Sequence, residues 1–217
     1  MWHVAETTST NSDLLDAADH LPDRTVLVAD HQTAGRGRLD RRWEAPPGAN
    51  LLVSTLFRSV PDDPSELTRR FGLAVVRAAT AVGVAGAGLK WPNDVVLGGA
   101  KLAGILAQRA VNGAVVVGVG VNVGWAPEGA ARLDAELPPL DVLRAVLAAY
   151  DDLPADVAAD YRTNLVTLGM RVRVERPADT IVGTAIDVEA DGRLVVLDEC
   201  AITHRLDVGD VVHLRPA

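Results

Sequence analysis

Cysteine is nearly absent from this sequence of 217 residues, which contains only Cys200. A single thiol excludes an intramolecular disulfide and a thiolate metal cluster. Aromatic residues make up only 4% of the chain, so the core must be built mainly from valine, leucine and alanine. Hydrophobic residues make up 48% and charged residues 23%, which is the composition of a globular protein with one sizeable core.

Long apolar runs are also missing. No stretch approaches the roughly 18 apolar residues that a membrane-spanning helix requires. The first residues, MWHVAETTSTNSDLL, lack the basic region and apolar core of a secretory signal peptide. These absences predict a cytoplasmic enzyme or binding protein with no membrane partner.

The common signatures of nucleotide and hydrolase sites are absent as well. The sequence contains no G-x-x-x-x-G-K-[ST] phosphate loop, no G-x-S-x-G nucleophile motif and no H-E-x-x-H zinc motif. The glycine pairs at 35–37 and 118–120 do not continue into G-x-G-x-x-G. The five histidines are scattered, which argues against a histidine metal site. Any nucleotide must therefore bind to another kind of site.

The net charge is −8, from 21 basic and 29 acidic residues, yet one segment is strongly basic. Residues 34–43, AGRGRLDRRW, carry four arginines, two glycines and a tryptophan, and we call them the arginine loop. A nucleic-acid backbone and a nucleotide triphosphate both suit such charge, and a solvated loop is the simpler alternative. Because nucleic-acid-binding domains are usually basic overall, the acidic balance favours a small anionic ligand, and we expect no DNA binding.

The first three quarters of the chain alternate between helix and strand patterns. A capping-box-like start at Thr10 to Asp13 predicts a helix over 10–21. A second helix is expected to begin at Pro64 after an Asp63 N-cap and to end at Gly83. Further helical spacing covers 139–167, with a break near Pro154. Short apolar runs predict strands at 25–29, 51–57, 94–97, 102–108 and 114–123.

The hairpins expected between residues 94 and 123, including a type I′ turn at Asn112-Gly113, predict an antiparallel meander. From Gly169 onward, five short strands separated by turn signals predict a small SH3-like barrel: MRVRVE, IVGTAIDVE, RLVVLD, AITHRL and DVVHLR. The expected fold class is therefore α+β, with a mixed, largely antiparallel central sheet flanked by helices and a C-terminal SH3-like β-barrel. We expect a catalytic domain over 1–167 and a small domain over 168–217.

Two further polar segments lie at the ends of predicted strands. Residues 90–94, KWPND, place Asn93 and Asp94 in a tight turn, where the amide suits a base edge and the carboxylate suits a cation or an amine. Residues 101–105, KLAGI, place Lys101 at the head of an apolar strand, with small residues after it that leave room for an apolar ligand. A plain strand-entry turn and a surface lysine are the alternatives.

Taken together and in this order, the arginine loop, KWPNDV, KLAGIL and GVGVN at 118–122 resemble the biotin–protein ligase family. Ser9-Thr10-Asn11, Gln32 and the closing GDVVHLR also match that family's pattern. The resemblance implies a class II synthetase-like catalytic fold. It also implies activation of biotin by ATP to biotinoyl-5′-AMP, with release of pyrophosphate. Biotin would then pass to a lysine of a carboxylase's biotin carrier domain. ATP and biotin would be substrates, with Mg²⁺, and the enzyme would be a monomer or homodimer.

The resemblance also implies roles for individual residues. Those implied to bind biotin are Ser9, Thr10, Gln32, Gly35, Arg36, Arg38, Lys101 and Gly104. Those implied to bind ATP are Arg41, Arg42, Trp43, Asn93, Lys101 and Asn122, with Trp43 packed on adenine and both asparagines at its edge. Lys101, Arg36 and Arg38 would be catalytic, because positive charge must screen the approach of two anions. Asp94 would orient the carrier lysine or Mg²⁺, and both roles stay open.

The sequence departs from the family at Asp40, where relatives usually have glycine within G-R-G-R-x-G-R. An aspartate can adopt left-handed backbone geometry there at some cost. Its carboxylate also stands beside Arg38 and Arg41, so we hypothesise that it pairs with them and holds the loop in the empty enzyme. The chain further enters the catalytic domain within its first ten residues, so we expect no N-terminal winged-helix repressor domain.

Two rival functions remain. A lipoate- or octanoate-protein ligase uses the same catalytic fold and differs in a few pocket contacts. A non-catalytic biotin-binding protein would not need Lys101, Arg36 or Arg38 to bind the ureido ring, so their presence argues against it. The role of the barrel is open between a stabilising cap, a contribution to ATP binding and carrier docking, in which Arg171 or Arg173 would take part.

Overall fold

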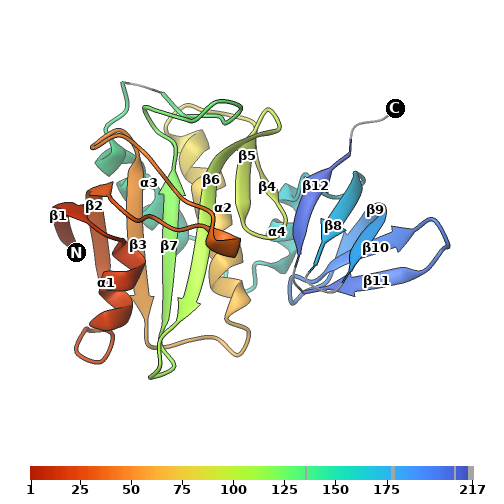
Figure 1. Ribbon diagram of the computed structural model, residues 1–217, viewed down its shortest axis with the longest axis horizontal. Coiled ribbons are helices and arrows are strands. Elements are labelled where there is room, and N and C mark those ends of the chain that lie inside the picture. The colour runs from red at the N-terminus through yellow and green to blue at the C-terminus, as the bar shows by residue number, and fades with distance from the viewer. Residues whose placement is uncertain (135, 177–178, 208, 215–217) are drawn as a thin grey trace.

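The computed structural model describes residues 1–134, 136–176, 179–207 and 209–214, and of Asp40 it describes the backbone alone. A seven-stranded sheet with helices on both faces is followed by a five-stranded antiparallel sheet (Figure 1). The strands of the large sheet are β1 (Trp2–Thr7), β2 (Val26–Gln32), β3 (Leu51–Phe57), β4 (Ala87–Lys90), β5 (Asp94–Leu97), β6 (Ala100–Arg109) and β7 (Val115–Val121). The helices are α1 (Thr10–Asp16), the short 3₁₀ helix η1 (Arg38–Asp40), α2 (Ser65–Ala81), α3 (Pro139–Asp151) and α4 (Ala158–Asn164).

The large sheet has the strand order β1-β2-β3-β7-β6-β5-β4, in which β1 and β2 are parallel and every other pair is antiparallel. Helices α2 and α3 pack against one face, and α1 covers part of the other (Figure 1). Strand β3 is buried along its whole length because both of its faces are covered. The expected mixed, largely antiparallel sheet flanked by helices is confirmed.

Several local predictions need correction. Helix α2 begins at Ser65 with Pro64 as its N-cap, one residue later than expected, and Asp63 accepts a hydrogen bond from the Ser65 amide (2.9 Å). Helix α1 has Ser9 as its N-cap, makes no side-chain capping bond and ends at Asp16, five residues before the expected end. Strands β1 and β4 were not anticipated, because WHVAET and AGLK show neither a clear alternation nor a long apolar run.

The turn between β6 and β7 is not of type I′. That type requires positive φ at both central residues, whereas of Asn112 and Gly113 only Gly113 has it (φ 88°). The Gly113 amide donates to the Ala110 carbonyl (3.0 Å), and Ala110 in turn pairs with Ala114. The connection is thus a three-residue loop that closes on a left-handed glycine.

The small sheet confirms the expected SH3-like domain. Its strands, in the spatial order β11-β10-β9-β8-β12, are β8 (Arg171–Glu175), β9 (Thr180–Val188), β10 (Leu194–Asp198), β11 (Thr203–Leu206) and β12 (Asp210–His213). Its apolar side chains join the same buried cluster as those of the large sheet. The two parts of the chain therefore share a continuous core.

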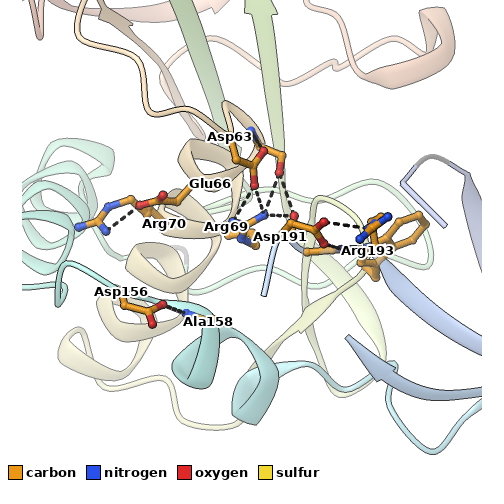
Figure 2. A network of polar contacts seen from close by, with 11 residues as sticks. Asp63, Glu66, Arg69, Arg70, Asp156, Ala158, Asp191 and Arg193 are labelled. Atoms are coloured by element: carbon orange, nitrogen blue, oxygen red, sulfur yellow. Dashed lines mark hydrogen bonds and ion pairs between the residues drawn. The ribbon is translucent and has the colours of Figure 1, made fainter. Parts of the chain in front are cut away.

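A buried arginine anchors the β9–β10 hairpin to the rest of the protein (Figure 2). Arg69, which is only 6% exposed, donates to Asp63, to Ser65 and to the backbone carbonyl of Asp191. The Trp91 indole donates to the Gly192 carbonyl next to it (2.8 Å). These bonds fix the C-terminal domain beside α2 and the KWPND turn.

Candidate functional site

One cavity of about 230 Å³ brings the sequence-predicted residues together, on the face of the sheet that also carries α1. The predicted residues that line it are Ser9, Thr10, Gln32, Arg36, Arg38, Arg41, Arg42, Trp43, Asn93, Asp94, Lys101, Gly104 and Asn122. Gly35, which was also predicted, is buried and is not part of the cavity lining. A Cβ atom there would come within 2.4 Å of the Trp43 carbonyl oxygen and 2.9 Å of Gln32 Nε2, so this position needs glycine.

The arginine loop folds back on itself over the cavity. Arg36 and Arg42 form an isolated antiparallel bridge, and the Trp43 amide donates to the Gly35 carbonyl (3.0 Å). Helix η1 forms the tip, where Leu39 has left-handed backbone geometry (φ 55°) and is 65% exposed. The left-handed residue thus lies one position before Asp40.

Two of the four arginines contact the C-terminal domain. Arg38 donates to Asn93 Oδ1 (3.1 Å) and to the Gly209 carbonyl (3.1 Å), and its partial burial lowers the pKa of its guanidinium. Arg41 forms an ion pair with Asp210, and that hydrogen bond raises the pKa of Arg41. Arg42, by contrast, is exposed and lies 3.5 Å from Glu44.

The Asp40 side chain lies outside the part of the chain that the structure describes, so its pairing with Arg38 or Arg41 stays a prediction.

Lys101 lines the cavity, and its ammonium interacts with Asp94 and with the Trp43 ring. Its Nζ is 2.6 Å from Asp94 Oδ1 and 5.6 Å from the centre of the Trp43 ring, a cation–π distance. A Cβ atom on Gly104 would come within 3.2 Å of the same Nζ. The lysine therefore stands at the head of β6, as expected, with Asp94 as its partner.

The Trp43 ring rests on a floor made by two paired glycines. Gly104 and Gly120 are register partners on β6 and β7. A Cβ atom on Gly120 would lie 2.4 Å from the ring, and one on Gly104 would lie 3.2 Å from it. The indole Nε1 is buried and has no hydrogen-bond partner among the described residues.

Both asparagines expected at the base edge already hold protein groups. Asn93 accepts from Arg38 and donates to the Ile105 carbonyl (2.7 Å). Asn122 accepts from Asn50 (3.3 Å) and donates to the Ala131 carbonyl (2.9 Å). In this conformation they position the cavity wall, and a contact with a base stays a prediction.

The inner end of the cavity is a buried network of uncharged polar groups. The Gln32 Oε1 atom accepts from the Thr10 amide (2.8 Å), and the Thr10 hydroxyl lies 2.7 Å from Ser54 Oγ. Ser54 donates to Asn11 Oδ1 (2.6 Å), and Asn11 Nδ2 donates to Gln108 (2.8 Å). The network joins α1 to strands β2, β3 and β6.

Sequence reasoning gave no site role to several residues of this site: Asn11, Ser54, Gly118, Gly120 and Asp210. The glycines at 118 and 120 were considered only as a dinucleotide motif and as part of the GVGVN family pattern. Their spacing of two along an apolar run was the available signal, because glycines on one face of a strand allow a close approach. Ser54 and Asp210 gave no local signal, since their partners lie 43 and 169 residues away.

Among the described residues, no group of three or more histidine, cysteine, aspartate or glutamate side chains could hold a metal ion. In the same part of the chain, no helix is long and apolar enough to cross a membrane.

Two family models match the chain. The biotin/lipoate A/B protein ligase family matches residues 2–125, and the biotin protein ligase C-terminal domain matches residues 167–214. These ranges cover the seven-stranded sheet and the five-stranded sheet, respectively.

Among proteins of known function, the chain is 43% identical to the biotin–[acetyl-CoA-carboxylase] ligase of Mycobacterium tuberculosis, over 98% of this chain and 88% of that protein. It is 31% identical to the enzyme of the same name from Paracoccus denitrificans, over 90% of each. A solved structure of the biotin protein ligase of Aquifex aeolicus with biotin and ATP covers 100% of this chain and 98% of its own, with a TM-score of 0.81 and 26% identity.

Proposed function

The chain belongs to the biotin/lipoate A/B protein ligase family, and from that premise we propose that it is an ATP-dependent biotin–protein ligase. The observation that carries the proposal is the polarity of the cavity that the predicted residues line. Uncharged hydrogen-bonding groups line the inner end, and Lys101 with the arginine loop lines the other. A ligand that suits both ends of the cavity has a neutral polar ring, an apolar chain and a carboxylate that lies next to a bound nucleotide. Biotin is such a ligand.

In the first reaction, a carboxylate oxygen of biotin attacks the α-phosphorus of MgATP. The bond from that phosphorus to the bridging oxygen of pyrophosphate breaks, and biotinoyl-5′-AMP forms. Two anions must approach each other, so cationic groups fixed at the meeting point lower the barrier. Lys101 Nζ is proposed to lie between the carboxylate and the α-phosphate, where a compact ammonium serves both partners.

The arginine loop is proposed to close over the adenylate. Arg36 and Arg38 would bind near the α-phosphate, and Arg41 and Arg42 near the leaving pyrophosphate, because all four line the same cavity. Trp43 is proposed to stack on the adenine, a role that its position beside Lys101 supports. Mg²⁺ would arrive as part of MgATP.

In the second reaction, the neutral amine of a carrier lysine attacks the acyl carbon, and AMP leaves as the acyl–oxygen bond breaks. The attacking nitrogen must lose a proton during this step. Asp94 already holds Lys101 at 2.6 Å, which supports a role in positioning that ammonium, and the orientation of the carrier lysine by Asp94 is a second role we propose.

At the inner end, Ser9, Thr10 and Gln32 are proposed to bind the ureido ring, with backbone amides of residues 36–38 assisting.

We also propose a division of the chain at 167/168, which the start of β8 at Arg171 supports. The acceptor is proposed to be the biotin carrier domain of a carboxylase. The net charge of −8 supports the absence of DNA binding, and a cytoplasmic location and a monomer or homodimer complete the proposal.

Incubation with MgATP, biotin and a purified carrier domain tests the proposal. We expect pyrophosphate release and one biotin per carrier, and we expect Lys101→Ala to slow adenylation by about 100-fold or more, as when an electrostatic stabiliser of a transition state is removed. Pyrophosphate exchange that is faster with lipoate or octanoate than with biotin would replace the proposal by its rival. Tight biotin binding without any pyrophosphate would indicate a binding protein.

A further inference from the structure

The two amide side chains of the inner network have fixed orientations. Asn11 Nδ2 faces the Leu106 carbonyl (3.2 Å), which can only accept a hydrogen bond, so Asn11 Oδ1 must face Ser54. The backbone amide of Thr10 donates to Gln32 Oε1, so the oxygen of Gln32 must face Thr10. Each assignment rests on a backbone group that has one possible role.

Between these amides lies a row of four oxygen atoms. Asn11 Oδ1, Ser54 Oγ, Thr10 Oγ1 and Gln32 Oε1 are separated in turn by 2.6 Å, 2.7 Å and 3.0 Å. The outer two are carbonyl oxygens and carry no proton, and each hydroxyl carries one. Three contacts therefore share two protons, and one contact is always without a proton.

The geometry indicates which contact that is. The two shorter contacts have the lengths of O–H···O hydrogen bonds, and both lie on Ser54, which has no exposed surface. Ser54 donates to Asn11, so Thr10 must donate to Ser54. The Thr10–Gln32 contact, at the end that lines the cavity, is then two oxygen atoms facing each other without a proton between them.

We propose that Ser54 and Asn11 are specificity-determining positioning residues, which turn the Thr10 hydroxyl proton inward so that Thr10 and Gln32 offer oxygen acceptors to an N–H group of the ligand. The inference rests on the proposed function and identifies what selects its substrate. A ureido ring has N–H donors that fill the gap. A dithiolane ring or an alkyl chain has none, and would leave the two oxygens buried and unpaired, which is costly.

Gly118 keeps this arrangement in place. A Cβ atom at position 118 would lie 2.3 Å from Asn11 Oδ1, so a larger residue would push the amide away from Ser54. Asn11, Ser54 and Gly118 come from α1, β3 and β7. Together they fix the direction of the Thr10 hydroxyl proton at the inner end.

The variant Ser54→Ala tests the proposal, because the Thr10 proton must then turn to Gln32 and fill the gap that the ligand needs. We expect the KM for biotin to rise about tenfold, the effect of one buried hydrogen bond. The kcat and the KM for ATP should not change, and the activity with lipoate should rise because the two oxygens are no longer left unpaired, so discrimination against lipoate falls. Thr55→Val is the matched control, since Thr55 is equally buried, lies next along β3 and faces the other side.

An unchanged KM for biotin in Ser54→Ala, or an equal loss with biotin and lipoate, would overturn the proposal. Ser54→Cys, which keeps the volume and a weak donor, covers the case in which the alanine variant does not fold, and an intermediate KM is expected. Calorimetric titration of wild type and variants with biotin alone separates the role of Ser54 from the proposed ligase activity. The titration measures the affinity of the inner end for biotin without catalysis, whereas a failure of wild-type pyrophosphate exchange with biotin would refute only the proposed function.

Discussion

The two ends of the cavity are held in opposite ways. At the inner end, Thr10, Asn11 and Ser54 are each at most 5% exposed, and hydrogen bonds to three strands fix them. At the outer end, the arginine loop is held largely by solvent-exposed contacts, such as the ion pair between Asp210 and Arg41, whose side chain is 63% exposed.

This difference matches the chemistry of the two ligands. A neutral ring is recognised by the directions of its hydrogen bonds, which only a rigid, water-free pocket can fix. A triphosphate brings its own charge and moves through several states in the reaction, so the groups that bind it must rearrange. Exposed ion pairs contribute little to stability, so the loop can release them when the nucleotide arrives.

The largest effect is expected where the two ends meet, at the glycine floor under Trp43. Gly120→Ala places a methyl group within the ring's contact distance, so Trp43 must move. We expect kcat/KM for ATP in pyrophosphate exchange to fall by about 100-fold, because misplaced groups near the chemistry cost rate steeply. Biotin binding without ATP should stay within about twofold if the inner end is as independent as its bonding indicates.

The control is the same substitution in a Trp43→Ala background. If Gly120 acts only by leaving room for the Trp43 indole, Gly120→Ala causes no further fall in kcat/KM for ATP in the Trp43→Ala background. An additive loss would mean that the alanine disturbs the sheet itself.

A smaller effect is expected from the ion pair between the loop and the C-terminal domain. Asp210→Asn should lower the KM for ATP up to about threefold, since Arg41 no longer has to leave a pair that is worth at most about 1 kcal/mol when the nucleotide arrives. The difference from wild type should vanish at about 1 M salt, where charges are screened within a few ångströms. The double variant with Arg41→Gln measures the coupling directly, and a coupling of zero would show that the pair does not order the loop.

The smallest effect is expected from Asp40→Gly at the loop tip. If Asp40 holds the empty loop, hydrogen exchange of residues 36–43 should become faster while the adenylation rate changes by less than about threefold, because only a surface contact is lost. If both the hydrogen exchange and the adenylation rate stay unchanged, Asp40 does not hold the empty loop.

The sequence predicted those parts of the molecule whose signals are local. Strand β3, helix α2 and the five strands of the small domain followed from apolar spacing and turn residues. The arginine loop, Asn93 and Lys101 followed from ordered motifs, and the structure brings them around one cavity.

What escaped prediction is set by distant partners. Strand β1 mixes three apolar and three polar residues without a regular alternation, and it is a strand because it pairs with β2 at the sheet edge. Ser54 cannot be told from any other serine in an apolar strand without its partner Asn11, which lies 43 residues earlier, and the contact of Arg41 with Asp210 spans 169 residues. Such pairings depend on the tertiary fold, and residue type alone does not encode them.

The anchor of the C-terminal domain has a consequence for mutational tolerance. Arg69 and Trp91 bind the carbonyl oxygens of Asp191 and Gly192, so the contact does not depend on the side chain at 191. Gly192 is different, because its left-handed backbone (φ 88°) lies against the Arg69 guanidinium, and a Cβ atom there would come within 2.5 Å of Nη1. The Asp191 carboxylate serves the turn itself, since it accepts from the Arg193 amide (3.1 Å), whereas any residue other than glycine at position 192 would displace the arginine that attaches the two domains.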